Sequence, residues 1–308
     1  MPPKNTELIP MDSRIVKCRI VSPMCVHGAD PKGLELRVPP IKAAMRYWWR
    51  ALNGQYTNST NLYEAEAAIF GGTNGDKGQA SAFKLQLQEE REVSWVNTDL
   101  LPHRREVRGN PLSKPCYEAG GWFKIRIIVR ENNEGVTVEY IENLLWLTGV
   151  LGGIGQRARR GFGNFILCKK DENCFVSFDV IRSKVQHFSG MNVDQSGTVI
   201  TSHHKCKWPS LLSIKLLSKK SNGYADLLFS IGYATHNLTG RENYAKEVGK
   251  GNPRFASPIH FSIVPTGENE YRTLVTVVTL PKNRGKTRKP TQLQEDLINE
   301  VTNPTKNS

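Results

Sequence analysis

The stretch EYIENLLWLTGVLGGIGQRARRGFGNFILC, residues 139–168, decides the fold of the first half of this chain. Its apolar run over residues 139–150 predicts a helix, and the short run over residues 164–168 predicts a strand. Between them, residues 152–163 are rich in glycine and arginine. Helix, loop and strand in this order would close a β-α-β-β-α-β unit.

The preceding sequence supplies the other members of that unit. Apolar runs predict strands at residues 15–21, 82–88 and 122–129, and a helix at residues 41–52. A shorter helix is predicted at residues 62–70. When this extra helix is set aside, the order is that of a ferredoxin-like fold, in which helices cover one face of an antiparallel sheet.

A length of 308 residues predicts two domains, which we expect at residues 1–170 and 171–308. Residues 169–173 are polar and suit a connection, and residues 293–301 read as a final helix. The tetrapeptides VSPM at residues 21–24 and ASPI at residues 256–259 echo each other, as a duplicated fold would leave behind. The expected class is therefore α+β, with two ferredoxin-like (RRM-like) βαββαβ folds in tandem.

The charge balance points to an anionic partner. The chain has 42 Lys+Arg against 29 Asp+Glu, a formal net charge of +13 and an isoelectric point near 9.5. This composition favours binding to nucleic acid. No apolar run approaches the roughly 20 residues of a membrane-spanning helix, and the N-terminus lacks the apolar core of a signal peptide. We expect a cytoplasmic protein with no membrane partner.

The cysteines predict no metal site. They are scattered without Cys-x-x-Cys spacing, which favours reduced thiols over a disulfide framework. Cys206, with His203 and His204, could form a zinc cluster with Cys168 and Cys174, but no pair has finger-like spacing. We predict neither a metal nor a cofactor. The six cysteines are Cys18, Cys25, Cys116, Cys168, Cys174 and Cys206.

The glycine- and arginine-rich loop, residues 152–163, is the main candidate for function. Its five glycines, Gly153 and Gly155 among them, allow positive φ and close approach to a ligand. Arg157, Arg159 and Arg160 carry planar guanidinium groups that match phosphate oxygens. The alternative is a tight helix-to-strand turn with solvated arginines.

Other glycine-rich phosphate loops do not match these residues. The Gly-Lys-Ser/Thr sequence of a P-loop is absent from the loop. Ala158 stands where a dinucleotide-binding loop would have its third glycine, and the loop follows a predicted helix rather than a strand. An extended polyanion is the better ligand.

The helix at residues 41–52 carries the second group of candidates. Pro39 and Pro40 mark its start. One arc of the helix is apolar and includes Trp48, which we expect in the core. Trp49 lies at the border, where it could stack on a base. A neighbouring stripe is basic, and its alternative role is a solvated helix face. The stripe consists of Lys42, Arg46 and Arg50.

Several segments together resemble the RAMP superfamily, and within it the first RAMP subunits of Cmr (type III-B) CRISPR effector complexes. The matching segments, in chain order, are PPIK at residues 39–42, RYWWRAL at 46–52, EAAIFGG at 66–72, the loop at 152–163 and RFASP at 254–258. Two departures are Ala43, where a glycine is often seen, and residues 194–211, which match nothing recognisable.

The resemblance implies a pair of ferredoxin-like folds in a guide-RNA ribonucleoprotein of antiviral defence. It implies a subunit that binds RNA without cutting it and holds the 3′ part of the guide RNA and its duplex with target RNA. The implied partners are guide RNA, target RNA and other Cmr subunits. Lys250 and Arg254, in a second glycine-containing loop, could flank the same groove, although a hairpin turn is the alternative.

Two other functions remain open at this stage. A RAMP endoribonuclease could use His27 and Asp30, because slicing RAMP proteins have a loop aspartate in a comparable position. No second acid or base is tied to these residues by spacing, so we expect no catalytic residue and no enzyme. A freestanding RNA chaperone would have the same charge. The basic run at residues 282–289 is expected to be a solvated tail.

Overall fold

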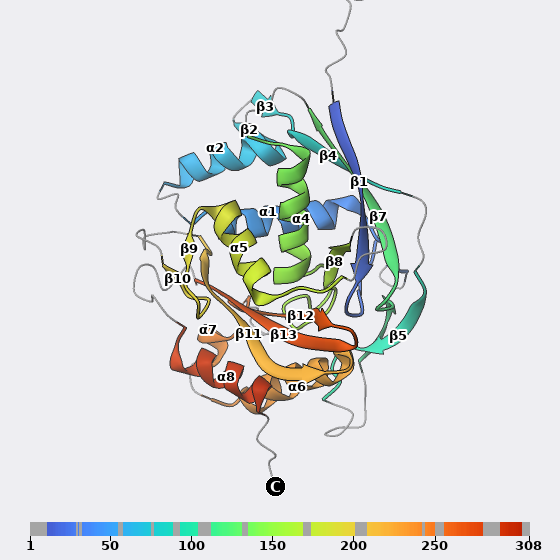
Figure 1. Cartoon of the computed structure of the whole chain (residues 1–308), viewed down its shortest axis with the longest axis vertical. Coiled ribbons are helices and arrows are strands. Elements are labelled where there is room, and N and C mark those ends of the chain that lie inside the picture. The colour runs from blue at the N-terminus through green and yellow to red at the C-terminus, as the bar shows by residue number, and fades with distance from the viewer. Residues whose placement is uncertain are drawn as a thin grey trace, which may run out of the picture.

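The chain has a mixed α+β architecture with antiparallel sheets (Figure 1). In the computed structural model, the residues whose structure is described are 11–28, 30, 33–54, 58–74, 77–88, 93–103, 112–130, 135–168, 174–200, 208–241, 244–249, 256–279 and 290–303.

The first half contains a four-stranded antiparallel sheet of order β4-β7-β1-β8. Helix α1 follows β1 along the chain, and helix α4 follows β7. All four predicted strands and both predicted helices are confirmed, with ends shifted by a few residues. These elements are β1 (Met11–Ile20), α1 (Val38–Leu52), β4 (Phe83–Leu87), β7 (Trp122–Arg130), α4 (Val138–Leu151) and β8 (Phe165–Cys168).

Local sequence explains where these helices begin. The Thr137 side chain accepts a hydrogen bond from the Tyr140 N–H at the start of α4, and prolines occupy the first turn of α1. Helix α4 is buried along nearly all of its length because it lies between the first sheet and the second half of the chain. It therefore forms the centre of the molecule.

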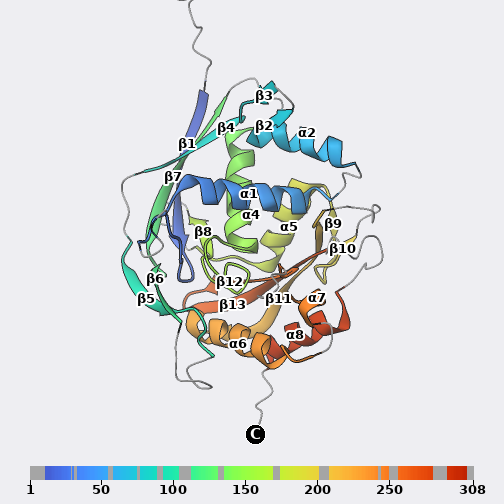
Figure 2. The same ribbon diagram turned by 180° about the vertical axis from the view of Figure 1, so that it is seen from behind.

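Three elements are inserted into the βαββαβ order of the first half, namely one helix and two small hairpins. Helix α2 (Ser59–Phe70) was predicted from residue 62 and lies beside α1 (Figure 2). The small hairpins β2–β3 and β5–β6 were not predicted. They comprise β2 (Gly72–Asn74), β3 (Lys77–Gln79), β5 (Trp95–Asp99) and β6 (Ser113–Tyr117).

The second half contains a three-stranded antiparallel sheet of order β11-β13-β12. Helix α4 contacts β12 and β13, and α6 contacts all three strands of this sheet. The predicted final helix is confirmed as α8. The elements are α5 (Phe178–Ser189), β9 (Asn192–Val193), β10 (Val199–Ile200), β11 (Leu211–Ser221), α6 (Tyr224–Asn237), α7 (Tyr244–Glu247), β12 (Ile259–Gly267), β13 (Glu270–Val278) and α8 (Gln292–Thr302).

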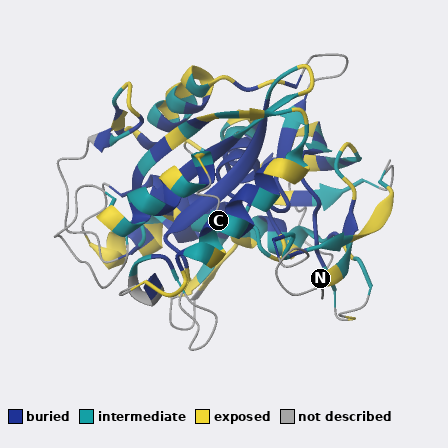
Figure 3. Cartoon of the chain, turned by 90° about the horizontal axis from the view of Figure 1, so that it is seen from below, coloured by how far each residue is buried: buried dark blue, intermediate teal, exposed yellow. Residues whose placement is uncertain are grey.

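One hydrophobic cluster spans the two halves. It includes Trp48 and Phe162 from the first half and Ile263 and Leu274 from the second. Buried residues, dark blue in Figure 3, accordingly run through the middle of the molecule. The side chain of Asn164 adds a polar link, since its Oδ1 accepts from the Ile263 N–H at 2.9 Å and its Nδ2 donates to the Gly149 carbonyl at 3.3 Å.

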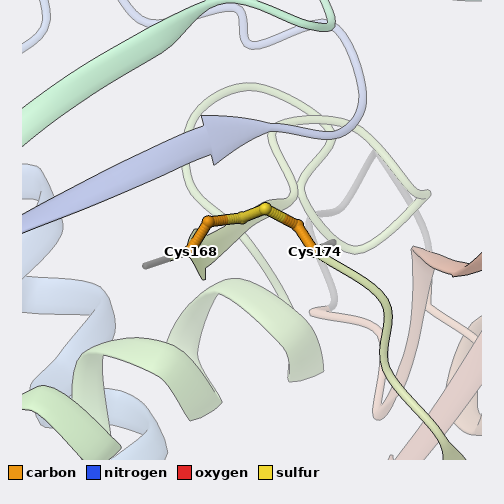
Figure 4. Close-up of a disulfide and its surroundings, with 2 residues drawn as sticks. All are labelled: Cys168 and Cys174. Atoms are coloured by element: carbon orange, nitrogen blue, oxygen red, sulfur yellow. A yellow bond between two sulfur atoms is a disulfide. The ribbon is translucent and has the colours of Figure 1, made fainter. Parts of the chain in front are cut away.

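Cys168 and Cys174 form a disulfide, which corrects the expectation that the thiols are reduced (Figure 4). Cys168 ends β8 and Cys174 opens the segment leading to α5. The Cα atoms of Cys168 and Cys174 lie 5.4 Å apart, a normal span for a disulfide. Residues 203, 204 and 206 lie outside the described residues. Within the described residues there is no cluster that could hold a metal ion and no helix able to span a membrane.

Candidate nucleic-acid interface

The loop at residues 152–163 closes on itself. The Ile154 N–H donates to the Gly163 carbonyl at 3.0 Å, and the Gly163 N–H donates to the Pro23 carbonyl at 2.9 Å. Gly153 and Gly163 have φ of 68° and 69°, and a Cβ on Gly163 would overlap the Ile154 carbonyl oxygen. These two glycines therefore serve the fold, whereas the sequence suggested that they approach a ligand.

Gly155 lies on the outer side of the loop. It is exposed and has a φ of 94°. A Cβ at this position would lie 2.6 Å from the Cys25 carbonyl oxygen, which also accepts the Gln156 N–H at 2.8 Å. Gly155 thus allows the loop to lie against the segment after β1 while its own backbone faces solvent.

Arg160 joins the two halves of the molecule. Its Nη1 donates to the Ser257 hydroxyl at 3.2 Å and to the Ile259 carbonyl at 3.3 Å, and its guanidinium lies over the Phe261 ring. Burial lowers the pKa of Arg160. Because these contacts fix the side chain inside the structure, Arg160 is not a solvated cation ready for phosphate.

Arg157 and Arg159 are both partly exposed. Arg157 has a φ of 56°, a conformation that costs a non-glycine residue about 1–3 kcal/mol. The Arg157 carbonyl accepts the Arg160 N–H at 2.7 Å. This hydrogen bond closes the turn at residues 157–160, which carries all three arginines. The guanidinium carbon of Arg159 lies 5.7 Å from the centre of the Tyr47 ring.

A shallow groove of about 210 Å³ separates the loop from α1. Pro40, Ala44 and Tyr47 line it from α1, Arg159 lines it from the loop, and His260 lines it from β12. Residues 152–155 form one wall. We call this the loop groove. It combines a guanidinium, an aromatic ring and exposed backbone, the groups that bind the backbone and bases of RNA.

His260 and Tyr47 connect the loop groove to the core. The Tyr47 hydroxyl lies 2.9 Å from His260 Nε2, and the His260 ring also packs against Trp48. Burial lowers the pKa of His260 well below its usual value, and Arg159 and Arg160 lower it further. At neutral pH the imidazole is therefore neutral, and the positive charge of the groove comes from arginine.

The basic stripe on α1 is not an open surface. Lys42 Nζ donates to the Ser81 hydroxyl at 2.8 Å, and burial lowers the pKa of this lysine. Arg46 donates to the Phe70 and Gly71 carbonyls at the end of α2, where it also compensates the helix dipole. Lys42 and Arg46 thus contact α2 and the segment after it rather than forming the solvated helix face that was the alternative, and their role in RNA binding stays a prediction.

Arg50 is the exposed member of the stripe. Its Nε lies 2.7 Å from Glu66 Oε2, and the other carboxylate oxygen of Glu66 lies 3.3 Å from Arg46 Nε. The Arg50 side chain is 45% exposed, whereas that of Glu66 is 11% exposed. Part of the Arg50 side chain is therefore accessible to solvent.

Trp49 is buried, which contradicts its expected position at the surface. It is 2% exposed, as is Trp48, and its indole N–H donates to the Tyr140 hydroxyl at 2.8 Å. Trp49 does lie between the apolar arc and the basic stripe of α1, as its position in the helix predicts. Helices α2 and α4 cover this part of α1 and bury the side chain. Trp49 offers no ring face for stacking on a base.

Three further predicted groups fall elsewhere. Lys250 and Arg254 lie outside the described residues. His27 is partly buried and its backbone pairs with Leu34, while Asp30 is exposed. Sequence reasoning missed Tyr47 and His260 as groove residues. Tyr47 lay within the quoted RYWWRAL segment, but nothing in the sequence linked His260 to α1.

The sequence is similar to one protein superfamily and to two proteins of one organism. A sequence model of the RAMP superfamily matches residues 17–166. The CRISPR system Cmr subunit Cmr1-1 of Pyrococcus furiosus is 24% identical over 280 residues, covering 78% of this chain and 80% of that protein. Cmr1-2 of the same organism is 28% identical over 179 residues, covering 50% of this chain and 94% of that protein.

Two solved structures share the fold. The crystal structure of Cmr1 from Pyrococcus furiosus in its apo form has a TM-score of 0.59 at 17% identity, covering 95% of this chain and 97% of that one. A chain of the cryo-EM structure of the Type III-B Cmr-beta bound to cognate target RNA has a TM-score of 0.57 at 12% identity, covering 94% and 99%.

Proposed function

The chain belongs to the RAMP superfamily through residues 17–166, and from that premise we propose that it is an RNA-binding subunit of a type III-B (Cmr) CRISPR effector complex. In this role it holds the 3′ region of a guide RNA and the duplex of that guide with target RNA, in antiviral defence. It does not cut RNA. Its partners are guide RNA, target RNA and other Cmr subunits.

The observation that carries this proposal is the loop groove. In this groove the Arg159 guanidinium lies over the Tyr47 ring, and Gly155, which also lines the groove, is exposed. A protein whose sequence specificity comes from base pairing reads RNA by backbone and shape, for which arginine and exposed backbone are sufficient.

The fold of this proposed subunit is a tandem of two ferredoxin-like units, with the boundary at residues 170 and 171. The order β4-β7-β1-β8 with α1 and α4 supports the first unit. Within the described residues, the second unit has β11, α6, β12, β13 and α8, with three strands in the order β11-β13-β12. An isolated bridge from Thr198 to Ser213 brings the residue before β10 beside β11.

The test is to purify the chain from its native host and analyse what accompanies it. We expect one population of guide RNAs sharing a defined CRISPR-derived end, together with several partner proteins in fixed stoichiometry. A heterogeneous RNA pool on a lone chain would instead indicate a freestanding RNA chaperone. The cytoplasm remains the predicted compartment, since the proposed RNA partners are made there.

The non-catalytic role is tested with labelled target RNA. The purified chain should bind this RNA and leave it intact, with and without magnesium. Cleavage by a reconstituted complex should survive His27→Ala and Asp30→Ala. Cutting at a defined position by the chain alone, abolished by Asp30→Ala while binding persists, would establish the endoribonuclease and refute the proposal.

A further inference from the structure

Among the residues that the structure describes, one edge of β1 is open over part of its length. Strand β7 pairs with β1 from Met11 to Arg19, but β8 pairs only with residues 17–20. In Figure 1, β8 accordingly lies beside only one end of β1. Across the described part of the chain, residues 11–16 have no partner strand on the β8 side.

Hydrogen bonds near the end of β1 show which backbone groups face this edge. The Ile20 N–H donates to Gly121 on the β7 side, and the Val21 N–H donates to Asn164 on the β8 side. Because N–H and C=O groups alternate between the two sides of a strand, those of Ser13 and Ile15 point to the open edge. An unpaired edge of this kind is a template for another strand, and six residues offer about 20 Å of it.

A cavity of about 970 Å³ lies along the same edge. Its walls come from β1, β7, α4, β8, residues 174–176 and α5. Three large apolar side chains that line it are exposed: Ile15 at 50%, Phe175 at 38% and Val180 at 44%. Gathered in one place, such side chains mark a surface that binds another apolar group.

The charge of this cavity is mainly positive. Arg14, Lys17, Lys124 and Lys184 line it, and Glu142 is the carboxylate among the lining residues. Arg14 Nη1 lies 2.6 Å from Glu142 Oε2, and the other charged side chains among the described residues that line the cavity are lysines. A segment bound here would therefore be favoured if it carried carboxylates beside its apolar side chains.

We propose that the β1 edge groove, formed by residues 11–16 and this cavity, binds an extended acidic and aliphatic segment of a partner protein. The segment adds as a strand to β1, and its alternate aliphatic side chains enter the cavity beside Val180 and Phe175. The open backbone edge and apolar lining favour a protein segment over RNA. None of the residues that line this cavity lines the loop groove, so the site is separate from the proposed RNA function.

The probe is a fluorescein-labelled peptide, Ser-Glu-Val-Glu-Ile-Glu-Val-Ser, added to the full chain and followed by fluorescence anisotropy. We expect saturable binding, and at least tenfold weaker binding of the matched peptide with lysine in place of glutamate. Ser13→Pro removes an N–H from the open edge without touching the β7 ladder, so it should weaken binding at least tenfold. Ser13→Ala keeps that N–H and should bind like the unaltered chain.

Val180→Glu, on α5, provides a second variant that leaves the strand unchanged, and it should also weaken binding of the acidic peptide at least tenfold. Equal binding of the two peptides, no binding, or full binding by both Ser13→Pro and Val180→Glu would overturn the proposal. It would also be overturned if single-stranded RNA displaced the peptide and Val180→Glu lost RNA affinity, or if self-association of the chain occupied the edge. Filter binding of RNA at the loop groove tests the other function independently.

Discussion

Neighbouring residues of the same type perform different tasks in the loop at residues 152–163. Arg160 is held by Ser257 and Ile259 of the second half, whereas Arg159 lines the loop groove beside Tyr47. The sequence could propose three arginines for RNA, but it could not distinguish them. The distinction arises because β12, nearly 100 residues further along the chain, packs against one of them.

Arg159→Ala should therefore weaken RNA binding about tenfold, the loss of one charge-assisted hydrogen bond worth about 1.5 kcal/mol. For this variant, the slope of the logarithm of the binding constant against the logarithm of the salt concentration should become shallower by about 0.7 for single-stranded RNA. Filter binding over a salt series measures both quantities. Arg160→Ala is the matched variant, and it should instead lower the free energy of unfolding by about 1.5–3 kcal/mol because Ser257 and Ile259 lose a charged donor. The reverse pattern would exclude the loop groove as the RNA site.

His260 should make stability depend on pH. Burial, with Arg159 and Arg160 nearby, lowers the pKa of the folded-state imidazole, whereas the unfolded chain takes up this proton near the usual pKa of about 6.5. Stability is thus complete above that value and is lost as pH falls below it. Between about pH 7.5 and about pH 5.5, the free energy of unfolding should fall by about 1.4 kcal/mol more in the unaltered protein than in the His260→Gln variant. Denaturant titrations of both proteins at the two pH values measure these free energies. An equal loss of stability in the two proteins would contradict the prediction.

The helices and long strands of the first half were predictable because each shows a clear period or a continuous apolar run. Val16, Cys18 and Ile20 of β1 alternate inward, and α1 has a single apolar arc. Strands β12 and β13 lack alternation, since helices cover both faces of their sheet and nearly every residue is buried. Sequence reading therefore found the first sheet and missed most of the second.

Contact between α1 and α2 explains why Arg46 and Arg50 of the basic stripe form ion pairs within the protein. Glu66 of α2 holds Arg46 and Arg50 of α1 together, with its carboxylate almost buried. Glu66→Gln should lower the free energy of unfolding by about 1.5–3 kcal/mol, since two arginines lose their charged acceptor. Arg50→Gln, at a half-exposed pair, should cost no more than about 1 kcal/mol. Thermal and denaturant melts measure both, and equal effects would mean that burial of Glu66 does not matter.

The whole molecule should unfold in one transition, although its length predicted two domains. Trp48 and Phe162 share a hydrophobic cluster with Ile263 and Leu274, so neither half can lose its fold without exposing the core of the other. Tryptophan fluorescence and far-UV circular dichroism should give coincident denaturant curves. Two separated transitions would show that the halves unfold independently. The shared hydrophobic cluster would then contribute little to the cooperativity of unfolding.

The candidate site shows the limit of sequence reading at this scale. Gly155 and Arg159 were found because glycine and guanidinium chemistry is visible in the chain itself. The placement of His260 opposite Tyr47, 213 residues apart in sequence, depends on how the two halves pack. Burial of Trp49 depends in the same way on α2 and α4. Local patterns carry no information on such packing.

Asn164, whose amide bridges Gly149 and Ile263, makes the chain a natural candidate for fragment complementation. In a piece ending at residue 170, the Asn164 amide oxygen would lack its Ile263 donor and the shared apolar core would be exposed. The remaining piece would carry that Ile263 N–H and the other side of the apolar core. Recombination of the two pieces would restore the hydrogen bond and bury both sides of the apolar core at once. A break in the backbone between residues 168 and 174 would then be spanned by the disulfide, which could hold the rejoined pieces together covalently.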